Sequence, residues 1–202
     1  MKKQAYAAAA VLDSIAAIAF RTKKVRKVTK TALMPTLAVA APPRDPGMAV
    51  GLAGSWAGDV ALLGDSDKAF RTGLTGFLVA HLGYTAALAG RSTPGSRKAV
   101  LPILAGSAAL ATAFGKAAGP MGKPVALYAL TLGTMVAAAS TARGEGSRRV
   151  LGGAALFAVS DALLGASRFV LKGRAARVAT AGVIPTYTAA QWLLHTGFSR
   201  EG

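Results

Sequence analysis

Long apolar runs separated by short polar segments extend over nearly the whole of the 202-residue chain. Such runs are typical of membrane-spanning helices, which need about 20 residues to cross a hydrocarbon core about 30 Å thick. We therefore predict an all-α integral membrane protein with eight transmembrane helices in one transmembrane domain, residues 1–202. The expected helices lie at about 3–20, 31–41, 48–64, 72–90, 99–115, 124–142, 150–171 and 175–197.

The composition supports a membrane protein with essentially no soluble domain. Hydrophobic residues make up 52% of the chain, only 16% is charged, and the mean hydropathy is +0.43. A soluble domain of this length would carry more charge and clear amphipathic periodicity. The abundant Ala and Gly suit membrane helices that approach one another closely.

The basic residues point to topology and anionic headgroups. The net charge is +16, but nucleic-acid binding would need a soluble basic module, and none is present. The chain has no Cys, which excludes disulfides and thiolate metal sites. The sequence offers no ligand set for a metal, so we expect no cofactor.

The N-terminal part is the least regular. Residues 3–20 could pass for a signal peptide, but Asp13 interrupts the apolar core and basic residues follow at once. We predict that the basic segment 21–30 is a loop. The run 31–41 contains Pro35 and rises only about 17 Å as a helix, so it is either a partial span or lies in thinned membrane.

The distribution of charge predicts the orientation. With eight spans both termini lie on one side, which holds 10 of the 24 basic residues, and segment 21–30 lies on the other. The positive-inside rule then predicts termini outside the cytoplasm. We expect the membrane to be a bacterial inner (plasma) membrane.

A repeat relates the two halves of the chain. The stretch Gly58–Gly64 (GDVALLG) is matched about a hundred residues later by Ser160–Gly165 (SDALLG), with the aspartates 102 residues apart. The tetrapeptide Tyr-Thr-Ala-Ala occurs at 84–87 and at 187–190, 103 residues apart. We predict two parallel four-helix halves, 1–97 and 98–202, related by an axis along the membrane normal.

The repeat places Asp59 and Asp161 at the same depth. Each lies 11 residues after the expected start of its helix, about 16 Å below the same surface. We expect the two carboxyl groups to face one another across a central cavity, about 5–10 Å apart. Two buried carboxylates cannot both ionise cheaply, so a protonated acid beside an ionised base is expected. Paired carboxylates of this kind serve general acid–base chemistry.

These residues also carry a family resemblance. Gly58-Asp59, the run Gly76-Phe77…His81…Tyr84, Phe157…Ser160-Asp161 with Arg168-Phe169, and Tyr187…Gln191 resemble YhhN-type membrane proteins. The best-known animal members, the transmembrane protein 86 relatives, are lysoplasmalogenases. The resemblance implies an eight-helix fold and hydrolysis of the vinyl ether bond of lysoplasmalogen, which gives a fatty aldehyde and a glycerophospho-headgroup.

The candidate site residues each have a structural alternative. Asp59 and Asp161 match the essential carboxylates that the resemblance implies; the alternative is a polar contact between helices. His81, Tyr84, Tyr187 and Gln191 could bind substrate or form interhelical hydrogen bonds. Lys30 and Arg168 could bind a phosphate or snorkel to the interface. We expect His195 and Trp192 to be interfacial.

Three classes of function stay open at this point. The first is an intramembrane hydrolase in which one aspartic acid protonates the vinyl carbon and the other carboxylate activates water. Its partners would be a single-chain lysophospholipid substrate and membrane lipids. The second is a proton-coupled transporter or lipid carrier, because membrane carboxylates in parallel repeats suit transport too. The third, a non-catalytic helix bundle, leaves the matched aspartates unexplained.

Overall fold

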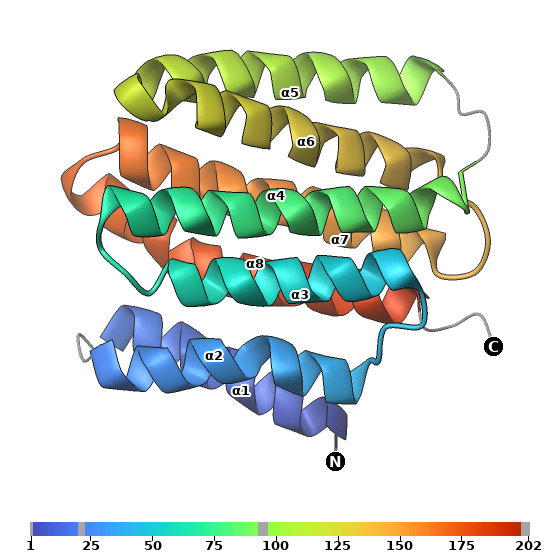
Figure 1. Ribbon diagram of the computed structural model, residues 1–202, viewed down its shortest axis with the longest axis horizontal. Helices are drawn as coiled ribbons and strands as arrows, with labels where there is room; N and C mark the ends of the chain where they lie inside the picture. The colour runs from blue at the N-terminus through green and yellow to red at the C-terminus, as the bar shows by residue number, and fades with distance from the viewer. Residues whose placement is uncertain (1, 20–22, 93–96, 199–202) are drawn as a thin grey trace.

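The computed structural model describes residues 2–19, 23–92 and 97–198, and this part of the chain forms eight α-helices (Figure 1). They are α1 (Lys2–Ala19), α2 (Lys23–Ala40), α3 (Pro46–Ala61), α4 (Asp67–Ala89), α5 (Arg97–Ala117), α6 (Gly122–Thr141), α7 (Ser147–Gly165) and α8 (Gly173–Phe198). A 3-10 turn, Gly119–Met121, precedes α6, and a π-helical turn, Ala166–Val170, extends α7.

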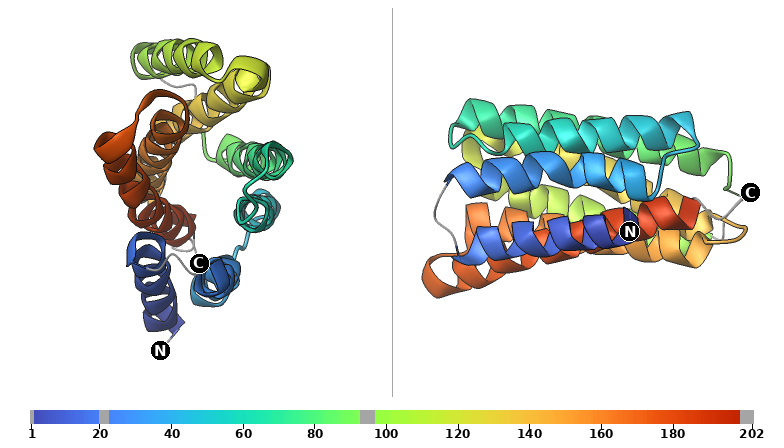
Figure 2. Two further views of the ribbon diagram at one scale, coloured as in Figure 1. Left: turned by 90° about the vertical axis from the view of Figure 1, so that its left-hand side faces the viewer. Right: turned by 90° about the horizontal axis from the view of Figure 1, so that it is seen from below.

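The helices form antiparallel pairs along one common direction. Consecutive helices pack together as α1 with α2, α3 with α4, α5 with α6, and α7 with α8, while α4 contacts α6 and α1 contacts α8. The end-on view in Figure 2 shows α3 and α4 on one side and α7 and α8 on the other, with α5 and α6 at one end and α1 and α2 at the opposite end. The start of α1 and the end of α8 lie at the same end of the bundle (Figure 1).

Four helical segments in the described part of the chain are long and apolar enough to cross a membrane. They are Asp67–Ala89, Ala99–Ala117, Gly119–Thr141 and Ser147–Val170. These segments comprise α4 to α7 with their flanking turns, so the chain has the character of a membrane protein. Eight spans are not established, because α3 has only 16 residues, or about 24 Å of helix, and α2 carries five basic residues in its first half.

Most of the basic segment 21–30, predicted as a loop, is helical, and residues 21–22 lie outside the described part of the chain. Residues 23–30 form the first half of α2, and Pro35 is accommodated inside the same helix. The loop prediction was wrong because Lys and Arg are good helix formers and their charge indicates polar surroundings, not an irregular backbone. The predicted orientation depended on that loop and stays a prediction.

Local contacts define the start of helix α3. Pro46 occupies its first turn, and the carboxylate of Asp45 accepts hydrogen bonds from the backbone N–H groups of Gly47 and Met48 at 2.7 and 3.2 Å. This is the usual N-cap arrangement. Gly54 of α3 lies so near α4 that a β carbon there would come within 2.7 Å of Gly76 O. This close approach brings Asp59, near the end of α3, into the bundle interior.

The buried core follows the centre of the bundle and includes aromatic rings from α4, α7 and α8. Phe77, Phe157 and Tyr187 pack edge to face, with ring centroids 5.4 to 6.2 Å apart. Around them the interior also contains charged and polar side chains, among them Asp13, Lys30, Asp59, His81 and Gln191. Buried groups of this kind need partners, and those partners define the candidate site. The predicted division into halves 1–97 and 98–202 stays a prediction.

Candidate active site

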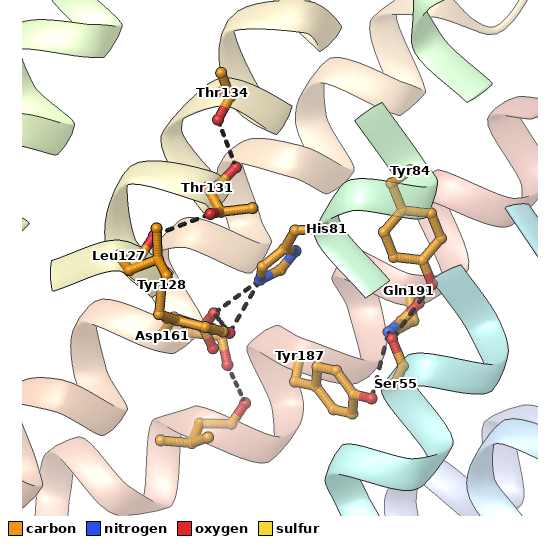
Figure 3. A network of polar contacts seen from close by, with 12 residues as sticks. Ser55, His81, Tyr84, Leu127, Tyr128, Thr131, Thr134, Asp161, Tyr187 and Gln191 are labelled. Carbon is orange, nitrogen blue, oxygen red and sulfur yellow. Dashed lines mark hydrogen bonds and ion pairs between the residues drawn. The ribbon is translucent and has the colours of Figure 1, made fainter. Parts of the chain in front are cut away.

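Asp161 belongs to a cluster of three polar side chains from three helices, which we call the Asp161 cluster. The hydroxyl of Tyr128 (α6) donates a hydrogen bond to Oδ2 of Asp161 (α7). Nε2 of His81 (α4) lies 3.0 Å from the Tyr128 hydroxyl oxygen and 3.6 Å from Asp161 Oδ2. Figure 3 shows the three side chains converging on one point. Sequence reasoning found Asp161 and His81, and the structure adds Tyr128 between them.

The hydrogen bonds of the Asp161 cluster allow a proton to sit at either end. Tyr128 has one hydroxyl proton, which it can donate to an ionised Asp161 or to an unprotonated Nε2 of His81. In the first arrangement His81 donates to Tyr128, and in the second a protonated Asp161 does so. In both arrangements the Tyr128 hydroxyl bridges the ring nitrogen and the carboxyl group. The cluster therefore forms a continuous hydrogen-bonded path between His81 and Asp161.

A largely apolar cavity of about 280 Å³ adjoins this cluster, with Asp161 and Tyr128 in its wall. It lies between α4, α5, α6 and α7, the helices that suit a membrane. The side chain of Asp161 is 14% exposed. The apolar wall includes Phe70, Leu74, Leu110, Phe114, Leu132 and Phe169. An apolar cavity with a few convergent polar groups is the usual form of a small-ligand site.

Asp59 lies in a separate group of polar side chains, which we call the Asp59 cluster. Nζ of Lys30 (α2) lies 2.9 Å from Asp59 Oδ1, and the hydroxyl of Tyr187 (α8) donates to Oδ2 at 2.7 Å. The side chains of Lys30 and Asp59 are 8% and 0% exposed. Lys30 therefore neither reaches the membrane interface nor stands free to bind a phosphate. It neutralises a buried carboxylate.

The Asp59 cluster continues through hydrogen bonds between α3, α4 and α8. Gln191 donates from Nε2 to Ser55 Oγ at 2.8 Å, and the Tyr84 hydroxyl donates to Gln191 Oε1 at 2.7 Å (Figure 3). His195 Nε2 lies 3.3 Å from the Tyr84 hydroxyl oxygen. His195 is buried, three residues before the end of α8 at Phe198, and its expected interfacial position stays a prediction. Tyr84, Tyr187 and Gln191 thus make interhelical hydrogen bonds, the second of the two roles predicted for them.

The two aspartates do not line one cavity, contrary to the prediction. Asp161 lines the cavity between α4 and α7, whereas Asp59 is absent from its wall and fully buried. The packed rings of Phe77, Phe157 and Tyr187 connect the clusters, and Phe157 also meets the His81 ring at 4.8 Å. Spacing along a helix gives depth in the membrane but not the rotation of the helix about its axis. That rotation turns the two carboxylates to different neighbours.

Arg168 lies at one end of the cavity, in the π-helical turn after α7. Its guanidinium carbon is 3.9 Å from the centroid of the Phe70 ring, and Phe70 and Phe169 both line the cavity. Nη2 of Arg168 also lies 3.3 Å from Oδ1 of Asp67. The side chain of Asp67 is 82% exposed. This exposed ion pair is weak, and the phosphate-binding role expected of Arg168 stays a prediction. Single π-turns often occur at functional sites.

Three participants were missed from the sequence: Tyr128, Ser55 and, as a buried group, His195. Tyr128 was the one with a readable signal, since it is the only tyrosine in the predicted helix 124–142. Ser55 and His195 carried no pattern that distinguishes them from ordinary helix-packing residues.

Both clusters lie inside the stretch that matches a known family. The family model of the YhhN family matches residues 25–198, most of the chain. The chain belongs to the YhhN family. Comparison with curated proteins and with solved structures gives no match. Every residue of the Asp161 and Asp59 clusters falls within the YhhN match, whereas the whole of α1 lies outside it.

Proposed function

We propose that this YhhN-family protein is an intramembrane hydrolase of lysoplasmalogen-type lipids. It would cleave the vinyl ether bond of a single-chain lysophospholipid to a fatty aldehyde and a glycerophospho-headgroup. The observation that carries this proposal is the position of Asp161: a hydrogen-bonded carboxyl group in the wall of an apolar cavity between membrane-type helices. The proposal includes eight membrane spans and a bacterial inner membrane as its setting.

In this proposal Asp161 is the catalytic acid and base. Its carboxylic acid donates a proton to the vinyl carbon that is β to the ether oxygen, leaving an oxocarbenium ion beside a carboxylate. Water adds to the cation and gives one proton to the Asp161 carboxylate. The product of this addition is a hemiacetal. A proton then moves from the hemiacetal hydroxyl to the ether oxygen, the carbon–oxygen bond breaks, and the aldehyde and the alcohol leave. General acid–base catalysis of this kind contributes about 10²- to 10⁴-fold in rate.

The other residues of the site take supporting roles. Tyr128 hydrogen-bonds to the Asp161 carboxyl group and His81 contacts the Tyr128 hydroxyl, so the two residues position the acid. The apolar wall accommodates the fatty chain, and Arg168 at one end of the cavity pairs with the headgroup phosphate. Asp59 takes a structural role in place of the catalytic one predicted from the sequence, because Lys30 and Tyr187 occupy both of its oxygens.

The test is chemical. Purified protein is incubated with a 1-alkenyl lysophospholipid, and released fatty aldehyde is measured by mass spectrometry. In D₂O the aldehyde should carry one deuterium on the carbon next to the carbonyl, because protonation there is the first step. A saturated 1-alkyl lysophospholipid should bind and remain intact. Uptake of lipid with no aldehyde formed would instead identify a transporter or lipid carrier and refute the hydrolase.

A further inference from the structure

A second cavity, of about 510 Å³, opens at the other end of the bundle and is lined by three basic side chains. Lys3 comes from the first turn of α1, Arg44 from the link between α2 and α3, and Arg149 from the first turn of α7. The rest of the wall is Ala40, Ala41, Pro42, Trp192, Leu193 and Thr196. Three cations that are far apart in the sequence therefore meet at one hollow.

None of these cations has an acidic partner among the described residues. The ion-paired residues Lys30, His81 and Arg168 do not line this cavity. Asp45, next to Arg44, accepts two backbone hydrogen bonds through Oδ1 at the start of α3 and does not line the cavity. The cavity wall itself contains no acidic residue. Like charges gathered around a hollow create a positive potential that attracts anions.

The shape and position of this cavity suit a phosphate group at the membrane surface. Arg side chains bind phosphate through paired N–H donors, and Lys adds a point charge. Trp192 stacks on Tyr6 with ring centroids 5.4 Å apart, and Trp is favoured at headgroup level. Basic pockets between membrane helices bind anionic lipid headgroups.

This cavity is separate from the site of the proposed hydrolysis. It shares no lining residue with the cavity of Asp161. Arg149 and Arg168 lie 19 residues apart at opposite ends of the helical segment formed by α7 and its π-turn, about 28 Å by helical rise. We propose that Lys3, Arg44 and Arg149 form a phosphate-binding site, whose ligand is an anionic phospholipid headgroup or a soluble phosphate. The inference does not depend on hydrolase activity.

The experiment compares two triple variants with equal loss of charge. The site variant is Lys3→Gln/Arg44→Gln/Arg149→Gln. The control is Lys2→Gln/Arg143→Gln/Arg148→Gln, three basic residues at the same end of the bundle that do not line the cavity. Full-length proteins in neutral detergent are titrated with dihexanoyl phosphatidylglycerol, dihexanoyl phosphatidylcholine or inorganic phosphate, and binding is measured by calorimetry.

The wild type and the control should bind phosphatidylglycerol with similar affinity, and the site variant at least about tenfold more weakly, as expected for lost charge-assisted hydrogen bonds. Binding of phosphatidylglycerol but not of inorganic phosphate identifies a lipid headgroup as the ligand, and binding of both identifies phosphate itself. Equal weakening in the two triple variants would show a non-specific charge effect and overturn the proposal. So would absence of binding to the wild type, or unchanged binding in the site variant.

Discussion

Replacing Tyr128 with Phe removes the hydroxyl that bridges His81 and Asp161, whose Nε2 and Oδ2 atoms lie 3.6 Å apart. The ring stays in place, because Phe has the same shape and the tyrosine ring packs against His81 with centroids 5.2 Å apart. The hydroxyl donates to Asp161 Oδ2 and lies 3.0 Å from His81 Nε2. Tyr128→Phe therefore leaves the cavity intact and breaks both hydrogen bonds of the cluster.

The size of the effect follows from those bonds. A hydrogen bond to a charged group contributes about 1.5–3 kcal/mol, and each 1.36 kcal/mol in the barrier is a factor of ten in rate. If the hydroxyl positions Asp161, kcat should fall by about 10- to 150-fold. KM should change little, since the apolar wall that holds the chain is unaltered.

The assay is the rate of fatty aldehyde release per folded molecule, measured with saturating 1-alkenyl lysophospholipid. Tyr187→Phe is the matched control, because it removes an equivalent hydroxyl from the other aspartate. That variant should lose thermal stability and keep kcat within about threefold, as a residue outside the reacting groups would. A Tyr128→Phe enzyme with the same kcat as Tyr187→Phe would refute the reasoning.

Two further predictions test the other parts of the site. Lys30→Met leaves Asp59 buried without its cation. Breaking such a pair costs about 3–5 kcal/mol, so Tm should fall sharply. The control, Lys27→Met on the exposed face of α2, should leave Tm unchanged. Equal Tm values in the two variants would contradict the buried pair. Gly106→Leu should reduce kcat/KM for a long-chain substrate about tenfold, the equivalent of roughly two buried methylene groups. Its fold should survive, because a β carbon at this cavity-lining glycine meets no atom within 4 Å. Unchanged kcat/KM would show that the fatty chain of the substrate does not lie beside Gly106.

The sequence was most informative where apolar runs and turn residues agree. All eight helices were anticipated, and the largest error was the basic stretch at residues 23–30, which is helical. The charge of that stretch hid the helix, although nothing in its chemistry opposes one. Among the basic residues of this stretch, the position of Lys30 was the hardest to predict. A lysine is rarely buried unless it pairs with a carboxylate.

The sequence indicated most residues of the candidate site but not how they are arranged in space. The repeat identified Asp59, Asp161, Tyr84 and Tyr187, and the family resemblance added His81 and Gln191. Helical spacing could not show that these residues divide into two clusters. The face that each helix turns toward the interior is decided by packing against helices far away in the sequence. Tyr128 could be noticed as a lone tyrosine, but only the folded chain sets its hydroxyl against Asp161.

The most direct test of the account compares Asp161→Asn with Asp59→Asn in one assay. For each variant, aldehyde release per folded molecule is measured together with binding of the saturated 1-alkyl lysophospholipid. The account predicts that Asp161→Asn lowers kcat by at least about 10²-fold, the lower range for a general acid, and still binds the saturated lipid. Asp59→Asn should mainly lower Tm, with residual turnover in the folded fraction. Turnover by Asp161→Asn within about threefold of wild type, where a lost general acid would cost far more, would contradict the central claim that Asp161 is the catalytic acid.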